Sequence, residues 1–548
     1  MRNLSKKRDH AFMEGRIENK NLETPNVVIV GAGPVGVLTA NLLGMQGIPV
    51  LVIDQNPGIL EIPRAISLDQ DALRALQAAG FGEEIAASMP AISGIELISP
   101  FGGCFAKINA AGSLDCHPRL VSIYQPDLER ILRNGLKRFP NVQVWSECTY
   151  ISHIESDSNI VINVKCKESV CKVTTGYLLG CDGAHSQVRE NQGWVMLGSS
   201  YKEDWLILDV TNLPEQMNKV EFICDPKRPV AHVPGPNGSE RWEFLLHEGE
   251  TKEEMEKPEK VRELMKSWGD VASMEVQRIA VYRFQAKTAN CMGKGRVYLL
   301  GDSAHLTPPF AGQGLVSGIR DSLNLSWKVA SVVKKTASPE ILFSYDIERR
   351  PHAKKTIRLA VLLGSVIMTR SKLKAVVRDF IFKLLYYTPI KSYLFDLRIR
   401  PENSFKQGLF LKNKKIQNAS LLPGSIFPQS TVRLPNGNIQ FSDDLLGHSL
   451  CIVGYGTHPL DVMDANSKQV WERMGGKTLF FSNQQRTYKS ESLQPCAEDL
   501  TSTFSTAFGG LDRFVILRPD RTIVAVFSEE NANQTIVAFF KIYLGQEQ

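Results

Sequence analysis

Residues 26 to 54 constrain the fold of this chain more than any other stretch. The run Val27 to Val30 is continuous and β-branched, which predicts a strand buried on both faces. Gly31, Gly33 and Gly36 follow it with G-x-G-x-x-G spacing. The first glycine permits a tight turn, the second lets the backbone approach a pyrophosphate, and the third lets a helix pack closely on the strand. The stretch therefore predicts the phosphate-binding turn of a dinucleotide-binding domain.

A helix and an acidic residue complete this motif. The predicted helix from about Pro34 to Met45 directs its N-terminal N–H groups and the positive end of its dipole at the phosphates. Val50 to Ile53 predicts the second strand, and Asp54 follows the glycines by about 20 residues, where a carboxylate can bind ribose hydroxyls. The alternative is a glycine-rich turn without a ligand, which the strand, turn and helix context disfavours.

Length and composition are those of an ordinary globular protein. The 548 residues suffice for two or three domains, and the net charge of +6 is too small to indicate a nucleic-acid partner. Residues 1 to 25 are polar and predict a disordered tail without the core of a signal peptide. The longest apolar stretch, Leu359 to Met368, is about half a membrane span, so no transmembrane segment is predicted.

The cysteines give no sign of redox or metal chemistry. None of the ten lies in a C-x-x-C pair, and none is clustered with histidine at metal-ligand spacing, which predicts free thiols, a reduced cytoplasmic setting and no metal site. The alternating strands and helices of residues 425 to 548 predict a thioredoxin-like unit. Because this unit lacks a dithiol motif, we expect it to have a structural role.

Two further motifs follow the dinucleotide turn. Tyr177 to Arg189 reads as a strand, a tight turn at Asp182-Gly183 and the start of a helix. Gly295 to His305 reads as another strand and turn, and includes Asp302. A loop with two consecutive prolines and the sequence Gly312-Gln313-Gly314 then leads into a long helix.

Together these motifs resemble those of flavoprotein aromatic hydroxylases of the para-hydroxybenzoate hydroxylase class, over residues 26 to 395. Within that class the chain is most similar to the 3-(3-hydroxyphenyl)propionate and phenol hydroxylases, in the segments Pro63 to Ala65, Gln125 to Glu129, Ile223 to Pro226, Arg241 to Phe244 and Pro308 to Gly314. The resemblance implies an α/β fold: an FAD-binding Rossmann-type domain, an interleaved antiparallel-sheet substrate domain and a C-terminal thioredoxin-like domain.

The predicted domain boundaries follow the changes in pattern along the chain. The FAD-binding domain is noncontiguous, with a helical extension, and the sheet domain interrupts it. The ranges are a tail at 1–25, the FAD-binding domain at 26–195 and 286–395, the substrate-binding sheet at 196–285, a linker at 396–424 and the thioredoxin-like domain at 425–548.

The resemblance also implies which residues contact the cofactor. The FAD-binding set is Gly31, Gly33, Pro34, Gly36, Asp54, Arg64, Gln125, Asp182, Gly183, Arg189, Asp302, Pro309, Gly312, Gln313 and Gly314. Asp302 is expected to accept hydrogen bonds from ribityl or ribose hydroxyls. Single residues have simpler alternatives, since Asp302 could cap a helix and Arg64 or Arg189 could form salt bridges.

Two parts of this set carry further expectations. The N–H groups of Gly312, Gln313 and Gly314 are expected to face the flavin pyrimidine ring and stabilise the negative charge of reduced flavin. Pro309 and Gly312 are assigned a catalytic role, because they belong to a stiff loop beside the ring, where oxygen reacts. The motif with Asp182, Gly183 and Arg189 serves both FAD and the nicotinamide cofactor in the class, which explains the missing second G-x-G-x-x-G.

The implied function is hydroxylation of a small phenol by molecular oxygen through a flavin C4a-hydroperoxide, with NADH or NADPH as the transient electron donor. No catalytic base is identified, because His117, His232 and Tyr282 stand at no diagnostic spacing. Three alternatives remain open: tailoring of a polycyclic or heteroaromatic natural product, a membrane-surface flavin reductase, and a non-enzymatic flavin-binding module. A homodimer is possible.

The reductase alternative depends on residues 370 to 415. Lys and Arg are frequent there and alternate with Leu, Ile, Phe and Tyr, as in a peripheral membrane face or a polyanion-binding patch. A solvated outer face of helices is favoured, since the stems of basic side chains commonly cover apolar surface.

Overall fold

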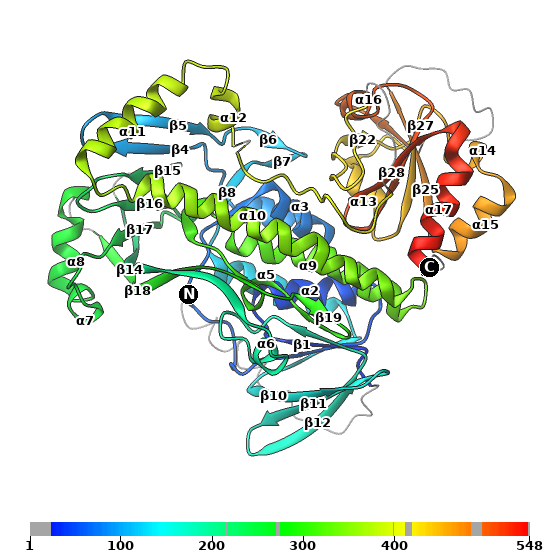
Figure 1. The fold of residues 1–548 in the computed structure, drawn as a ribbon, viewed down its shortest axis with the longest axis horizontal. Helices are drawn as coiled ribbons and strands as arrows, with labels where there is room; N and C mark the ends of the chain where they lie inside the picture. Colours follow the sequence, from blue (N-terminus) through cyan, green and yellow to red (C-terminus); the bar gives the residue numbers. More distant parts are fainter. Residues whose placement is uncertain are drawn as a thin grey trace.

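The computed structural model describes residues 24–213, 216–269, 274–397, 399–411, 419–483 and 496–545. Figure 1 shows a nucleotide-binding unit beside a second sheet, and a C-terminal unit at the other end of the molecule. Two long helices, α9 (Gly314–Val333) and α10 (Phe343–Ile367), run along the first two units.

The nucleotide-binding unit contains a six-stranded sheet of order β19-β20-β13-β1-β2-β9. Its strands are β1 (Val27–Val30), β2 (Val50–Ile53), β9 (Val142–Trp145), β13 (Tyr177–Gly180), β19 (Gly293–Lys294) and β20 (Val297–Leu299). All neighbours are parallel except β19 and β20. Strand β9 alternates in the way that is typical of antiparallel strands, yet it runs parallel to β2, because the preceding crossover sets its direction.

Helices cover this sheet and provide its crossovers. They are α2 (Pro34–Gly44), α3 (Gln70–Ala78), α4 (Gly82–Ser88), α5 (Gln125–Gly135) and α6 (Gln187–Asn191), together with α9. Helix α2 is buried on all sides, as its apolar composition requires, and packs against both α9 and α5.

The second unit is an eight-stranded sheet of order β21-β18-β14-β17-β16-β15-β4-β5. Its strands are β4 (Gly94–Ser99), β5 (Gly103–Asn109), β14 (Met196–Thr211), β15 (Lys219–Ile223), β16 (Val230–Pro234), β17 (Glu240–Leu245), β18 (Glu275–Ala289) and β21 (His305–Leu306). The predicted boundary at 196 therefore leaves out β4 and β5. These strands join the sheet through β15, a pairing between distant segments that no local pattern reports.

Helices lie at the edges of this sheet. Residues 252–265 form two helices, α7 (Lys252–Met255) and α8 (Pro258–Met265), because Pro258 begins a new helix. Helices α11 (Lys372–Leu385) and α12 (Lys391–Phe395) pack against β5. In the described ranges, no helix has both the length and the apolar composition needed to cross a bilayer.

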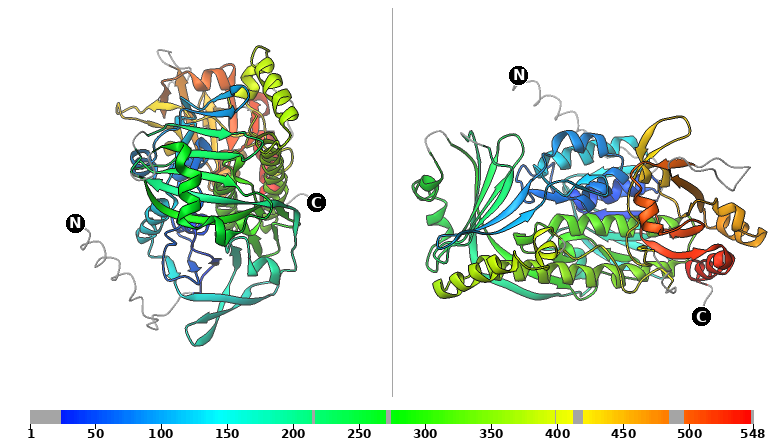
Figure 2. Two further views of the ribbon diagram at one scale, coloured as in Figure 1. Left: turned by 90° about the vertical axis from the view of Figure 1, so that its left-hand side faces the viewer. Right: turned by 90° about the horizontal axis from the view of Figure 1, so that it is seen from above.

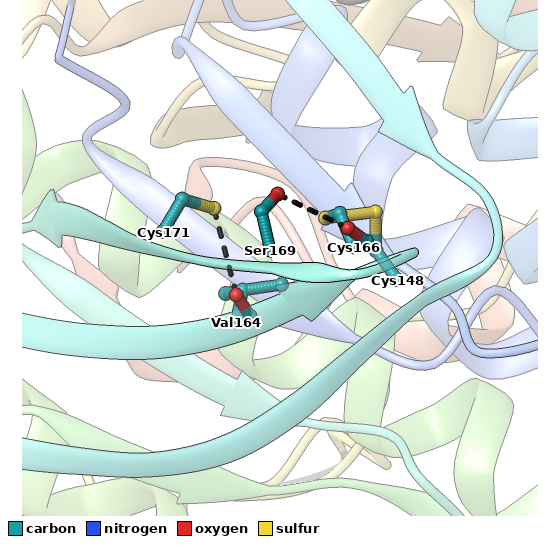
Figure 3. The surroundings of a disulfide bond; sticks show 5 residues. All are labelled: Cys148, Val164, Cys166, Ser169 and Cys171. Carbon is teal, nitrogen blue, oxygen red and sulfur yellow. Dashed lines mark hydrogen bonds between the residues drawn. A yellow bond between two sulfur atoms is a disulfide. The ribbon is translucent and has the colours of Figure 1, made fainter.

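The predicted absence of disulfides is wrong. In the three-stranded sheet of β10 (Cys148–Glu155), β11 (Ile160–Cys166) and β12 (Ser169–Thr175), Cys148 is paired across the strands with Cys166 and bonded to it (Figure 3). The remaining eight cysteines are free. The bond escaped prediction because hairpin register, rather than spacing in the sequence, places the two thiols opposite each other. Two short ribbons, β3 (Ser67–Asp69) with β8 (Leu120–Ser122) and β6 (Ser113–Leu114) with β7 (His117–Pro118), complete these units.

The C-terminal unit has a seven-stranded sheet of order β23-β22-β26-β25-β24-β27-β28. Its elements are β22 (Thr431–Arg433), β23 (Ile439–Phe441), α13 (Ser442–Leu446), β24 (Cys451–Tyr455), α14 (Pro459–Val462), α15 (Ala465–Arg473), β25 (Lys477–Asn483), β26 (Ala497–Asp499), α16 (Thr503–Phe508), β27 (Arg513–Leu517), β28 (Ile523–Ser528) and α17 (Ala532–Leu544). Parallel β24 and β25, the antiparallel hairpin of β27 and β28, and the closing α17 are the arrangement expected of a thioredoxin-like unit, which stays a prediction.

A buried charge cluster joins this unit to the long helices. Arg518 donates from both terminal nitrogens to the Glu348 carboxylate at 2.6 and 2.9 Å, and Lys328 Nζ lies 2.8 Å from the same carboxylate. All three side chains are inaccessible to solvent. Burial alone would raise the pKa of Glu348, but Arg518 and Lys328 outweigh it and hold this pKa well below its ordinary value.

We expect Arg518→Met to destabilise the protein by about 3–5 kcal/mol, because it leaves the charge of Glu348 buried with too few partners. Urea denaturation followed by tryptophan fluorescence measures the loss. Arg283→Met is the matched control, since Arg283 also forms a bidentate pair, with Asp204, but on an exposed strand. Equal effects of the two substitutions would contradict a structural role for the buried cluster.

Candidate active site

A cavity of about 340 Å³ lies between the nucleotide-binding unit and the eight-stranded sheet. Alternate residues of the sheet form one wall: Ile95, Ile108, Val220, Phe222, Ala231, Val233, Arg241 and Glu243. The opposite wall comes from four segments and includes Gly33, Pro34, Gly183, Gly301, Asp302 and residues 309–315. An apolar cavity with a few convergent polar groups has the character of a small-molecule site.

The three glycines of the dinucleotide turn have different surroundings. Gly31 has φ +105°, and a Cβ there would lie 2.3 Å from the carbonyl oxygen of Cys181. A Cβ on Gly36 would lie 2.0 Å from the carbonyl oxygen of Gly31, so the helix could not approach the strand. A Cβ on Gly33 would meet nothing within 4 Å. Gly33 is thus the position at which the backbone is open to the cavity.

The side chain of Asp54 binds the backbone of the glycine turn. Its carboxylate accepts hydrogen bonds from Ala32 N at 2.6 Å and Asn56 N at 2.7 Å. Asp54 is buried and does not line the cavity. The carboxylate therefore positions the glycine turn, and its expected bond to a ribose stays a prediction.

Asp302 presents a carboxylate to the cavity. Its side chain is exposed to the lumen and forms no hydrogen bond with any part of the protein that the structure describes. Dense protein around the lumen raises the pKa of Asp302, against the opposite effect of Arg64 and His305. Asp302 does not cap a helix through its side chain, so that alternative is not supported.

A buried network behind Asp302 fixes its turn. The Asp321 carboxylate accepts from Gly301 N at 3.0 Å, lies 2.7 Å from His305 Nε2 and accepts from Arg349 Nε at 2.8 Å. Burial alone would raise the pKa of Asp321, but the effects of His305 and Arg349 outweigh it and lower this pKa. The conspicuous His305 of the third motif is therefore a structural partner of α9.

The N-terminus of α9 also faces the cavity. Gly312 has φ +62° and donates its N–H to the carbonyl oxygen of Pro309 at 2.8 Å, so this N–H is already used and the expectation for it was wrong. The N–H groups of Gln313 and Gly314 have no acceptor in the described residues. The side chain of Gln313 points elsewhere, to Asp69 and Arg320. Two free N–H groups and the helix dipole remain available for an anionic group.

The proline loop is anchored by an aromatic side chain. Pro309 begins a short 3₁₀ turn whose next residue, Phe310, is buried against Trp205 and Phe284, with ring centroids 5.6 and 5.8 Å away. Pro309 and Phe310 both line the cavity. The loop therefore forms a rigid part of the wall.

Arg241 and Gln125 hold a strand-like segment at the cavity. Arg241 donates to the carbonyl oxygens of Pro63 and Arg64 at 2.6 and 2.8 Å, and Gln125 accepts from Ala65 N at 2.8 Å. The side chain of Arg64 lines the cavity, and no described residue forms an ion pair with it. Gln125 and Arg241 are positioning residues for Arg64.

The second motif is only partly at the cavity. Asp182 accepts from Ser186 Oγ at 2.5 Å and from Val188 N at 3.1 Å. Arg189 is buried and donates to the carbonyl oxygen of Ser303 at 3.0 Å. Gly183 alone of the three predicted residues lines the cavity, and a Cβ there would meet nothing within 4 Å. Asp182 and Arg189 therefore support the turn from behind.

Sequence reasoning missed two ionisable groups at the cavity. Glu243 lies on the cavity face of β17, and no described residue hydrogen-bonds to its carboxylate. Burial raises the pKa of Glu243, although the nearby Arg241 opposes this shift. Arg400, from the predicted linker, also lines the cavity and lies 3.9 Å from the Asp69 carboxylate. Polar and apolar residues alternate in Arg241-Trp242-Glu243-Phe244, and this pattern could have indicated that Glu243 lies on the same face of a strand as Arg241. No pattern in the sequence indicated that Arg400 reaches the cavity.

The three candidate bases considered from sequence lie outside the cavity wall. His232 stacks on Trp242, with ring centroids 4.2 Å apart, and its Nε2 lies 2.5 Å from the Glu240 carboxylate. His117 hydrogen-bonds to Gln77 at 2.7 Å. Tyr282 accepts a hydrogen bond from an arginine on the same strand.

Comparison with known proteins defines the class. Residues 24–360 match the family model described as FAD binding domain, and residues 424–541 match the HcaD C-terminal domain. Because the first match alone spans more than half of the chain, the protein belongs to this FAD-binding family. It is an FAD-dependent aromatic hydroxylase, so the class, the enzyme activity and the cofactor predicted from sequence are confirmed.

Particular relatives narrow the comparison. The 3-(3-hydroxy-phenyl)propionate/3-hydroxycinnamic acid hydroxylase of Escherichia coli K12 is 30% identical over 520 residues, covering 93% of each chain. Two solved structures share the fold at lower identity. The flavin-dependent monooxygenase PieE has a TM-score of 0.81 at 17% identity, covering 95% of this chain and 99% of its own. Aklavinone-11 hydroxylase has a TM-score of 0.76 at 21% identity with the same coverage.

Proposed function

We propose that this enzyme hydroxylates a small phenolic acid of the 3-(3-hydroxyphenyl)propionate or 3-hydroxycinnamate type, with molecular oxygen and with NADH or NADPH as electron donor. The 30% identity to hydroxylases of those acids over nearly the whole chain supports the substrate class. The observation that carries the proposal is the cavity, where an apolar wall contains one buried carboxyl group, Glu243.

The residues present fit FAD. At Gly33 and Gly183 the backbone is open to the cavity. The N–H groups of Gln313 and Gly314 have no acceptor among the described residues, and the Asp302 carboxylate has no donor among them. We assign these five, with Arg64 and Pro34, to direct contact with the cofactor. Gly31, Gly36, Asp54, Gln125, Asp182, Arg189 and Gly312 are assigned to shaping its site. When bound, FAD supplies the hydride acceptance and oxygen activation that side chains cannot provide.

Glu243 is the group best placed to handle the phenolic proton. Asp302 and Glu243 are the acidic residues in the cavity wall, and Asp302 belongs to the nucleotide-binding side. A phenol gains nucleophilicity at its ring carbons as its O–H proton moves to an acceptor. A carboxylate with a raised pKa is a stronger base than an ordinary one, so Glu243 can accept this hydrogen bond and draw the proton away during the reaction.

Arg400 is the candidate partner for the acid group of the substrate. It is a cation in the cavity wall, and its nearest anion, Asp69, is already engaged by Arg320 at 3.0 Å. A bound carboxylate at Arg400 would therefore gain a charge-assisted hydrogen bond.

The reaction is tested by incubating the holoenzyme with 3-(3-hydroxyphenyl)propionate, NADH or NADPH, and ¹⁸O₂. We expect phenol-stimulated NAD(P)H oxidation and one labelled oxygen atom in the product. Oxidation of NAD(P)H without labelled product for any phenol tested would contradict a hydroxylase function for this cavity.

Arg400→Leu is expected to raise KM for the phenolic acid by about tenfold or more, because one charge-assisted hydrogen bond is lost. The KM for an uncharged analogue, 3-ethylphenol, should change little. Steady-state kinetics with both compounds measures the difference. An equal rise in both KM values would assign Arg400 to the shape of the cavity instead of to the carboxylate.

Pro309→Gly is expected to keep FAD bound but to lower the yield of hydroxylated product per NAD(P)H. The substitution frees a backbone that proline restricts, and a looser wall admits water to the reacting centre. Hydrogen peroxide and product, both measured per NAD(P)H with the preferred phenol, report the change. If the loop only starts α9, the thermal midpoint should fall while this ratio stays at its parent value.

A further inference from the structure

Helix α11 has its apolar residues on the outside. Leu373 and Phe380 are 75% and 67% exposed and lie seven residues apart, and Tyr387, in the turn that follows the helix, is 86% exposed. Val376, Val377, Ile381 and Leu384 are also exposed and fill the same stripe. Residues at these intervals share one face of a helix. We call these seven residues the α11 face.

The opposite side of α11 is buried and includes an ion pair. Arg378 and Asp379 form an ion pair at 2.8 Å with both side chains inaccessible or nearly so. Arg378 also donates to the carbonyl oxygens of Val366 and Cys224, and its guanidinium lies 4.6 Å from the centre of the Phe105 ring. Ala375 and Phe382 also face inward, and Phe382 packs on Phe105 with ring centroids 5.7 Å apart. The helix therefore has a buried side that packs on the sheet and, in addition, an apolar stripe on the outside, where a helix on a water-soluble domain usually carries polar residues.

The charge around the α11 face has one sign. Lys372, Lys374 and Lys383 are exposed on the same helix, whereas its only acidic residue, Asp379, is buried. Lys383 Nζ donates to the carbonyl oxygen of Gly102 at 2.8 Å, which holds the turn that contains Gly102 beside the helix. Phe101 precedes Gly102 in this turn and is also exposed, so it adds to the apolar surface. The lysines do not cover the apolar residues of this helix, which stay exposed.

We propose that the α11 face binds an anionic lipid surface. Apolar side chains inserted at the headgroup boundary and lysines beside anionic headgroups are the two contributions that hold a helix in a membrane interface. A second copy of the chain would fit less well, because pairing the two faces would bring lysines of both copies together with no exposed acid on α11 to offset them. The surface differs from the active site and extends the proposed function.

The position of α11 connects the surface with the cavity. Helices α11 and α12 pack on β5, and Ile108 of β5 lines the cavity wall. In Figure 1 α11 lies at the outer edge of the sheet, on the side away from the C-terminal unit, and α12 lies between the two. The right-hand view of Figure 2 likewise places α11 toward the end of the molecule opposite the C-terminal unit. The α11 face therefore belongs to a helix that packs on the same sheet as the cavity wall.

The test is flotation of the FAD-loaded enzyme with vesicles of phosphatidylcholine containing 30% phosphatidylglycerol, about one lipid in three being anionic. We expect the parent protein to float with these vesicles, and Phe380→Ser/Leu384→Ser to reduce the bound fraction by about tenfold or more through lost apolar contact. Lys372→Gln/Lys374→Gln should reduce the bound fraction by about tenfold, because two charges near the anionic headgroups are lost. High salt should reduce the bound fraction of the parent protein to a similar extent, because it screens the same charges.

The matched control is Ile154→Ser/Val170→Ser, which removes two equally exposed apolar residues from the β10–β12 sheet. It should float like the parent. Parent-like binding by the α11 variant, or equal loss in the control, would overturn the proposal. So would a parent that fails to float and instead forms dimers, by light scattering, that Phe380→Ser/Leu384→Ser dissociates.

Discussion

Asp302→Ala is expected to yield a folded protein that purifies almost without flavin. The carboxylate faces the cavity with no hydrogen-bond donor from the described protein, so its oxygens are available to accept hydrogen bonds from the ligand. A hydrogen bond to a charged acceptor contributes about 1.5–3 kcal/mol, and the loss of one or two corresponds to a fall in FAD affinity of about a hundredfold. Absorbance at the flavin band and titration of the apoprotein with FAD measure this loss.

The structure around Asp302 predicts that the substitution lowers FAD binding without lowering the stability of the protein. The turn is held by Asp321 through Gly301 and His305, and none of these bonds involves the Asp302 side chain. The thermal midpoint of the FAD-free variant should therefore match that of the FAD-free parent. Asp302→Asn keeps an acceptor oxygen and should retain more flavin than the alanine variant. Normal flavin retention by Asp302→Ala would remove Asp302 from the site.

Glu243→Gln is expected to lower the rate of hydroxylation by about a hundredfold or more while leaving FAD bound. The amide has nearly the same shape as the carboxyl group but cannot take the phenolic proton, and general base catalysis contributes about 10²–10⁴ in rate. Single-turnover product formation with the phenolic acid measures the effect. Reduction of the flavin by NAD(P)H should continue, because Glu243 lies on the sheet side of the cavity.

The pH profile distinguishes a base from a packing residue. A carboxyl group acts as a base only when deprotonated, and burial raises the pKa of Glu243 above the usual range. The parent rate should therefore rise with pH through this raised pKa, and the Gln variant should lack that limb. Glu240→Gln is the control, since Glu240 is also buried on β17 but hydrogen-bonds to His232 instead of lining the cavity. A normal rate in Glu243→Gln would exclude the proposed role.

The sequence by itself determined the class of fold and the position of the nucleotide turn. Those conclusions come from short segments whose chemistry is local: the glycine turn at Gly31 to Gly36, and the strand ends that carry Gly183 and Asp302. Their backbone demands are read directly from residue type, because only glycine tolerates the close approach at Gly31 and Gly36. For the same reason the helix start after Gly312 could be placed without knowing what packs around it.

Only the tertiary structure decided what each side chain does. Arg189 and Asp182 belong to the predicted motif yet bond to backbone behind the cavity, whereas Glu243 and Arg400, from a strand and a supposed linker, reach its wall. The Cys148 disulfide and the outward apolar face of α11 likewise depend on which surface each segment turns toward its neighbour. The physical reason is that orientation is set by contacts between residues far apart in the chain, and a single sequence does not report those contacts.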